Sequence, residues 1–120
     1  MVTDSMFVIA VPDLERSARF YQDVLGFRVD ELAPGWRMFV GDRCRIMAGE
    51  CRDAMPPREL GDHSYFAYLI VDDVDSYYAR VRDAATEIVK QLRNEPWGMR
   101  EFGVRTADGH RIMIGSRCSP

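Results

Sequence analysis

A small set of side chains in this chain has the chemistry to move a proton or to hold a metal ion. His63 and His110 are its two histidines, and Glu50, Glu101 and Asp108 are the acids that could act beside them. Imidazole titrates near neutral pH and is the commonest general acid or base in proteins. Local spacing favours neither histidine, however. His63 lies in a polar loop and is interpreted as a surface residue, and His110 precedes Met113 by an odd step, so alternation should turn it away from Met113.

Other reactive groups form no recognisable motif. The chain has three cysteines, Cys44, Cys51 and Cys118, and no CxxC spacing, so neither a disulfide framework nor a structural zinc site is indicated. We interpret Cys44 as a core residue and Cys118 as a loose tail thiol. The sequence also lacks GxSxG, GxxxxGK[ST], GxGxxG and HExxH, which weakens hydrolase, kinase, dehydrogenase and metalloprotease interpretations.

Composition narrows the class of partner. A hydrophobic content of 47% is ample for a packed core, and a net charge of −3 with interleaved signs argues against a surface that tracks nucleic-acid phosphates. No window approaches the ~18 apolar residues of a membrane span, and the start lacks the pattern of a secretory signal. We therefore expect a cytoplasmic protein with no nucleic-acid or membrane partner.

The elements that must position these groups repeat in the two halves of the chain. The first half reads as a buried strand over 6–11, a helix over 13–25 capped by Asp13 and ended by Gly26, and three further strands. The second half repeats this order, with a strand at 65–71, a helix capped by Asp72 or Asp73, and three more strands. A Pro-containing linker at 51–62 separates modules of about 1–50 and 63–118.

Short echoes support a duplication. "CRIMAG" at 44–49 answers "HRIMIG" at 110–115, and "VPDL" at 11–14 answers "VDDV" at 71–74. Alternating strands that end in glycine can look alike by chance, but the order of elements, the caps and the turns agree as well. Met47 and Met113 are therefore predicted to occupy equivalent places.

Two longer segments carry a family resemblance. "VPDLERSARFYQDVLGF" resembles the opening signature of the vicinal oxygen chelate superfamily, which includes glyoxalase I, extradiol dioxygenases and the fosfomycin and bleomycin resistance proteins. "PWGMREFGVRTADGHRI" is similar to the closing segment of the bleomycin resistance branch. The resemblance implies an α+β fold of two tandem βαβββ modules, each a curled mixed sheet with a helix on its convex face, which together form a cleft. It also implies a homodimer.

Metalloenzymes of that superfamily place histidine and glutamate ligands at four inward-facing points. The resemblance puts Met6, Met47, Phe66 and Met113 at those points. A phenyl ring offers no donor, and a thioether suits copper(I) rather than zinc, iron or magnesium. We therefore expect no bound metal and no cofactor.

Strand alternation around these points predicts a ligand-binding face, although such a stripe can also be plain core. Trp97 is expected to stack on a planar group or to pin a loop at a dimer seam, and Arg100 to grip a ligand carboxylate or to form an ion pair. Glu101 and Phe102 are adjacent in a strand and must face opposite sides of the sheet. If Phe102 faces the ligand, Glu101 does not. In the opposite register Glu101 would be a lone buried acid, and the sequence leaves both registers open. The predicted ligand-binding residues are Met6, Val8, Trp36, Met38, Met47, Phe66, Tyr68, Trp97, Arg100, Phe102 and Met113.

The preferred hypothesis is metal-independent binding and sequestration of an aromatic or amphipathic small molecule, as in antibiotic resistance. The alternative is a metal-dependent lyase, isomerase or dioxygenase whose displaced ligands are residues such as His63, Glu50 or Glu101. A third possibility is a structural or regulatory protein in which the cleft is closed.

Overall fold

The computed structural model describes residues 1–61 and 63–118, and the chain divides into two compact units, Met1–Pro56 and Pro57–Pro120. The first unit contains β1 (Phe7–Val11), α1 (Leu14–Arg19), the π-helical segment η1 (Phe20–Val24), β2 (Arg28–Ala33), β3 (Trp36–Val40) and β4 (Arg45–Glu50). The second contains the 3-10 turn η2 (Pro57–Glu59), β5 (Tyr65–Ile70), α2 (Val74–Asp83), β6 (Glu87–Asn94), β7 (Met99–Arg105) and β8 (Arg111–Arg117).

Both units have the same sheet topology. The strand orders are β1-β4-β3-β2 and β5-β8-β7-β6. In each sheet the first and last strands of the unit pair in parallel, and the remaining neighbours are antiparallel. This confirms the predicted α+β fold of two tandem modules, each a mixed sheet with a helix.

Local chemistry sets the helix boundaries. Asp13 and Asp73 are the N-caps of α1 and α2, and their carboxylates accept hydrogen bonds from the backbone N–H groups of Arg16 and Ser76. Such caps satisfy donors that the first helical turn leaves unpaired. The helix expected over 13–25 is α-helical only to Arg19 and continues as η1, where the chain winds more widely until Gly26 adopts a positive φ of 79°.

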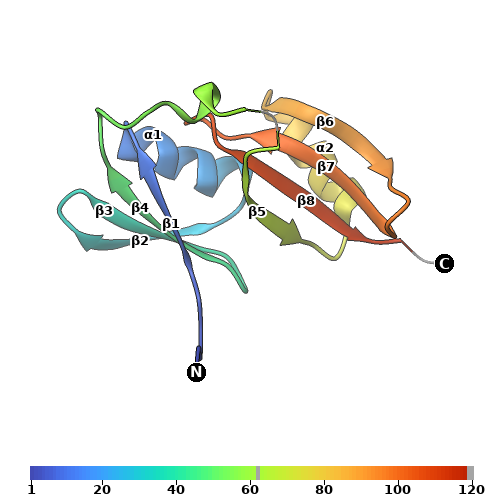
Figure 1. The fold of residues 1–120 in the computed structure, drawn as a ribbon, viewed down its shortest axis with the longest axis horizontal. Coiled ribbons are helices and arrows are strands. Elements are labelled where there is room, and N and C mark those ends of the chain that lie inside the picture. The colour runs from blue at the N-terminus through green and yellow to red at the C-terminus, as the bar shows by residue number, and fades with distance from the viewer. Residues whose placement is uncertain (62, 119–120) are drawn as a thin grey trace. The chain divides into compact units, whose positions relative to one another are not determined.

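The core of the first unit lies between α1–η1 and one face of its sheet (Figure 1). Val11, Phe39 and Ile46 are fully buried there. Tyr21 of η1 stacks on Phe39 of β3 with ring centroids 4.5 Å apart. Burial of each large apolar side chain stabilises the unit by roughly 1.5–3 kcal/mol.

The second unit repeats this packing with α2 against its sheet (Figure 1). Phe102, Val104, Ile112 and Ile114 are fully buried. The ring of Phe102 meets Tyr78 of α2 edge to face, 4.9 Å between centroids. None of the helices in the part of the chain that the structure describes is long and apolar enough to cross a bilayer.

Candidate functional site

The sheet of the first unit exposes apolar side chains on the face opposite α1, which we call open face 1. Val8 of β1 pairs with Met47 of β4, which pairs with Met38 of β3. Two residues further along these strands, the next row of the same face is formed by Ala10, Gly49 and Trp36. Val8 is 59% exposed and Trp36 39% exposed, whereas Ile9, Val11 and Phe39 on the other side of the same strands are buried.

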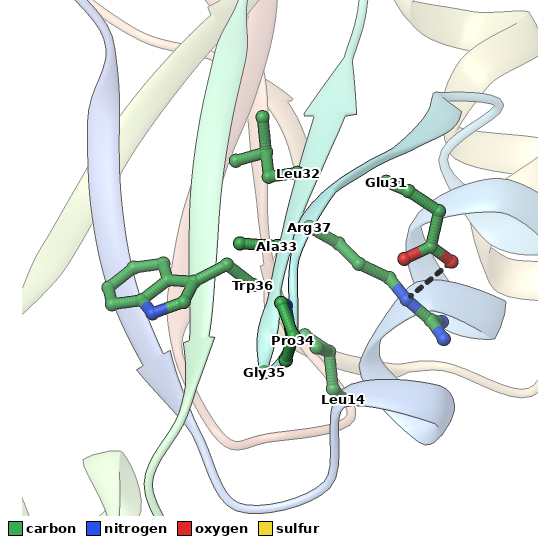
Figure 2. A pocket seen from close by; sticks show the side chains of 8 residues that line it. All are labelled: Leu14, Glu31, Leu32, Ala33, Pro34, Gly35, Trp36 and Arg37. Atoms are coloured by element: carbon green, nitrogen blue, oxygen red, sulfur yellow. Dashed lines mark ion pairs between the residues drawn. The ribbon is translucent and has the colours of Figure 1, made fainter.

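Trp36 lies across the strand beside it because that strand carries a glycine. A Cβ atom built at Gly49 would lie only 2.6 Å from the indole ring, so any side chain there would displace it. Figure 2 shows Trp36 and Arg37, successive residues of β3, pointing to opposite sides of the sheet. The side chain of Arg37 reaches towards α1, where it pairs with Glu15, and its Nε lies 3.4 Å from Oε1 of Glu31.

The hollow drawn in Figure 2 lies around the turn between β2 and β3. It has a volume of about 410 Å³, and Leu14, Pro34, Gly35, Trp36 and Arg37 are among the residues that line it. Its walls come from the end of β2, the turn, the start of β3 and the first residue of α1. It is therefore distinct from the row of Val8, Met38 and Met47.

The second unit has an equivalent surface opposite α2, open face 2. Tyr68 of β5 pairs with Met113 of β8, and Met113 pairs with Gly103 of β7. In the next row Gly115 pairs with Ile70 on one side and with Glu101 on the other. Tyr68 is 40% exposed on this face.

Glu101 is the centre of a polar cluster on open face 2. Its Oε1 accepts hydrogen bonds from Tyr68 Oη and Trp97 Nε1, each 2.9 Å away, and its Oε2 accepts one from Lys90 Nζ at 2.7 Å. The carboxylate is only 2% exposed, while Trp97 is 63% exposed. The ammonium group of Lys90 also lies over the indole ring of Trp97, 5.3 Å from its centroid.

The electrostatics of the cluster favour an ionised acid and neutral aromatic partners. Burial by itself would raise the pKa of the Glu101 carboxyl, but the hydrogen bonds from Lys90, Trp97 and Tyr68 outweigh it and hold that pKa below its usual range. Burial, followed by the adjacent carboxylate, raises the pKa of Tyr68 well above its ordinary value. Tyr68 therefore stays a hydrogen-bond donor throughout the physiological range.

The register of β7 corrects part of the predicted ligand-binding face. Phe102 pairs with Ile114 and is fully buried against α2, so its predicted place on the ligand-binding face is wrong. Arg100 shares the α2 side, where its guanidinium donates to Asp75 at 2.9 Å and to Asn94 at 3.1 Å. The alternative register, with Glu101 as the buried acid, is the one found.

Two other predicted residues lie outside the regular rows. Met6 precedes β1 and is exposed. Phe66 sits at an irregularity in β5, where Tyr65 pairs with Arg111 but Ala67 already pairs with Ile112. Its ring meets His110 edge to face at 5.4 Å between centroids. The simple alternation that assigned Phe66 and Tyr68 to one face is interrupted at this irregularity.

The remaining acid and histidine candidates are not gathered into one site. Glu50 Oε2 accepts a hydrogen bond from the backbone N–H of Leu14, 3.1 Å away. His63 lies in the loop before β5 with a positive φ of 69°. Burial lowers the pKa of His110, which is half-buried beside Phe66. Asp108 is buried in the turn between β7 and β8.

The donor set does not fit a resident metal ion of the kind that the resemblance implies. Met47 and Met113 supply only thioethers. Their neighbours on the adjacent strands are Val8 and Met38 for Met47, and Tyr68 and Gly103 for Met113. Within residues 1–61 and 63–118, no three His, Cys, Asp or Glu side chains are placed to share an ion. Glu101 already accepts three hydrogen bonds, one of them from a cationic ammonium group, which opposes binding of a second cation.

Sequence reasoning missed Lys90 and the pairing of Glu101 with two rings. Lys90 stands in a strand that reads as "EIVKQL", and nothing in that stretch signals a partner. The register of Glu101 had a usable signal. The turn around Asp108 and Gly109 places Arg105 opposite Arg111, and counting back from it pairs Gly103 with Met113.

Comparison with known proteins agrees with this architecture. The family model "Glyoxalase/Bleomycin resistance protein/Dioxygenase superfamily" matches residues 5–114. The glutathione transferase FosA of Serratia marcescens is 27% identical over 109 residues, covering 88% of this chain and 74% of the relative.

Solved structures show the same fold. TnmS3, an antibiotic binding protein from Streptomyces sp. CB03234, superposes with a TM-score of 0.74 at 25% identity, covering 98% of each chain. A glyoxalase/bleomycin resistance protein/dioxygenase from Alicyclobacillus acidocaldarius reaches a TM-score of 0.81 at 13% identity, covering 98% of this chain and 92% of its own. With a family match over nearly the whole chain and two mixed sheets of identical topology, this chain belongs to the glyoxalase/bleomycin resistance protein/dioxygenase superfamily.

Proposed function

We propose that this protein binds and sequesters a planar aromatic or amphipathic small molecule on its two open faces, without using a metal ion. The observation that carries the proposal is the exposure of aromatic rings on both faces, Trp36 on open face 1 and Tyr68 and Trp97 on open face 2, beside half-buried methionines that a ligand can also cover. TnmS3, an antibiotic binding protein, has the same fold at 25% identity and supports a ligand of antibiotic type. The proposed contact residues are Met6, Val8, Trp36, Met38, Met47, Phe66, Tyr68, Trp97 and Met113.

The magnitudes require several of these side chains to act together. Covering about 100 Å² of one ring contributes roughly 2.5 kcal/mol at 25 cal/mol per Å². Association itself costs at least about 4 kcal/mol, so a single ring cannot hold a ligand. Binding in the micromolar range therefore needs rows of side chains, such as Trp36 with Met38 and Met47, or Tyr68 with Trp97 and Met113.

We also propose that two copies associate and that the binding takes place in the cytoplasm. Each open face presents apolar surface over several strands, and burial of such surface drives association. Size-exclusion chromatography with light scattering at micromolar concentration should give twice the monomer mass of 13.8 kDa. A monomer at all concentrations would contradict the homodimer while leaving ligand binding open.

The metal-dependent alternative draws on the likeness to FosA, a glutathione transferase, at 27% identity. The side chains at the four points where metalloenzymes of the superfamily place their ligands do not suit a metal ion. Glu50 and Glu101, two of the candidates for displaced ligands, already accept hydrogen bonds. Elemental analysis of the purified protein tests this directly, and one equivalent of a transition metal per chain would favour the enzyme.

The proposed function is tested by adding planar aromatic antibiotics to protein treated with a chelator. A ligand that binds only the folded protein raises the melting temperature, by an amount that grows with its concentration. We expect saturable stabilisation and quenching of tryptophan fluorescence for at least one planar compound. Replacement of Trp36 by Ala on open face 1 should weaken that binding. A panel of intercalating antibiotics that leaves the melting temperature and the fluorescence unchanged would contradict the proposal.

A further inference from the structure

One buried carboxylate oxygen holds two exposed aromatic rings. Tyr68 Oη and Trp97 Nε1 both donate to Oε1 of Glu101, and both distances are 2.9 Å. The two rings come from different parts of the second unit, β5 and the turn before β7. Because the two rings share one acceptor, their positions relative to one another are fixed. Packing alone would hold them less well, since both rings are exposed.

We propose that Glu101 is a positioning residue that locks Tyr68 and Trp97 into a rigid platform for a planar aromatic ring that carries no positive charge. This rests on the proposed binding function and names the place and class of its ligand. Burying a carboxylate is costly unless charged or polar donors satisfy it. Here each donor is supplied, and two of the three belong to rings that a ligand can reach.

The neighbouring glycine is part of the same arrangement. A Cβ atom at Gly115 would lie 2.4 Å from Tyr68 Oη and 2.9 Å from Cβ of Glu101. The space that the glycine leaves is the space through which the hydroxyl of Tyr68 reaches the carboxylate. Fixing the rings before binding removes an ordering cost that a ligand would otherwise have to offset.

The charge of Lys90 selects the class of ligand. Its ammonium lies over the indole ring of Trp97, is paired with Glu101, and lies 3.6 Å from Oε1 of Glu95, whose side chain is only 5% exposed. A cation over an aromatic ring interacts with the negative potential of that ring. The carboxylates of Glu95 and Glu101 balance the charge of Lys90, but a second cation stacked on the same indole would still compete with Lys90 for the negative potential of that ring. A neutral planar ring does not compete for that potential.

The first arm of the test measures ring mobility without any ligand. The chain has two tryptophans, so Trp36→Phe leaves Trp97 as the single tryptophan, whose emission is followed. In this background, time-resolved anisotropy should show little local motion of Trp97, and Glu101→Ala should release fast local motion. Glu87→Ala is the matched control, since Glu87 accepts from Arg58 and Arg105 and from neither ring. Unchanged Trp97 motion in a folded Glu101→Ala variant overturns the positioning role.

The second arm uses acridone as the neutral probe and 9-aminoacridine as the cationic one. Glu101→Ala should weaken acridone binding about tenfold, which corresponds to ~1.4 kcal/mol and to the ordering of one or two side chains. Tyr68→Phe keeps the ring and removes one hydrogen bond, so it provides a milder variant that should fold if Glu101→Ala does not. It should weaken acridone binding in the same direction.

Lys90 variants separate charge from packing. Lys90→Met should raise the affinity for 9-aminoacridine about threefold relative to acridone, while Lys90→Arg, the matched control, should keep the preference for acridone. An unchanged preference in Lys90→Met overturns the ligand class. If wild-type protein binds neither probe, the ligand class fails together with binding at open face 2, whereas the anisotropy arm still decides whether Glu101 holds the rings.

Discussion

Adding one methyl group to each of two equivalent glycines should have unequal effects on stability. Gly49 and Gly115 lie towards the ends of the repeated strands β4 and β8, and both are overlaid by an aromatic side chain on an open face. At Gly49 the three atoms nearest to a new Cβ are in the indole ring of Trp36, at 2.6 to 2.8 Å. At Gly115 they include the backbone oxygen of Arg100 and Cβ of Glu101, both at 2.9 Å.

The unequal loss of stability follows from which neighbouring atoms can move away from the new methyl group. The ring of Trp36 is partly exposed and can swing away from a methyl group at position 49 at little cost, while backbone in the middle of a paired strand cannot. Overpacking that forces backbone shifts costs about 1–3 kcal/mol. Both substitutions also gain about 0.4–1 kcal/mol from a stiffer unfolded chain. We therefore expect Gly49→Ala to change the free energy of unfolding by less than about 1 kcal/mol and Gly115→Ala to lower it by roughly 1–2 kcal/mol.

Urea unfolding followed by far-ultraviolet circular dichroism measures both changes. With an unchanged m-value, a loss of stability appears as a lower midpoint for Gly115→Ala. The Tyr68→Phe/Gly115→Ala double variant should recover part of the loss, because it removes the hydroxyl that the new Cβ approaches most closely. Equal costs at the two glycines, or a larger cost at Gly49, would refute the reasoning from the fixed backbone at Arg100 and Glu101.

Other expectations follow from single contacts elsewhere in the chain. Asp13→Ala should lower the free energy of unfolding by about 1 kcal/mol, because the cap of α1 is lost, and Asp13→Asn should restore most of it, as urea unfolding will show. His110 is held neutral by burial, so protonation of the unfolded chain should destabilise the protein as pH falls below about 6.5; His110→Gln should remove this slope and His63→Gln should keep it in thermal melts across pH. Cys51 is exposed while burial raises the pKa of Cys44, so iodoacetamide followed by mass spectrometry should find Cys51 alkylated well before Cys44, and the reverse order would contradict this placement.

The fold could be predicted from sequence because several independent signals coincide. Asp13 and Gly26 bound one helix, Asp73 begins the other, and the repeated "RIM" strands lead to equivalent glycines. The replacement of the α-helix by η1 beyond Arg19 could not be predicted in this way. Helical spacing of apolar residues places the buried face, but it does not distinguish a turn of α-helix from a slightly wider one.

Open face 1 could also be predicted, since regular alternation in β1, β3 and β4 places Val8, Met38 and Met47 together. Open face 2 could be predicted only in part. The irregularity at Phe66 interrupts the alternation of side chains along β5. Which of Glu101 and Phe102 lies on the open face depends on how β7 pairs with β8, and the sequence of β7 alone does not determine that pairing. The contact of Lys90 with Glu101 joins positions on two strands, and no local pattern encodes it.

The two units share one sheet topology, and their open faces differ in chemistry because different residues face the equivalent glycines. The residue opposite Gly49 is Trp36, and the residue opposite Gly115 is Glu101. In the first unit the facing residue itself covers the glycine with a ring. In the second unit the facing residue is an acid, and it draws Tyr68 and Trp97 towards it by hydrogen bonds. A ring held by an acceptor has a fixed orientation, while a ring that only lies on a glycine can slide. Selectivity between planar ligands should therefore reside in the second unit, and the first should contribute mainly apolar area.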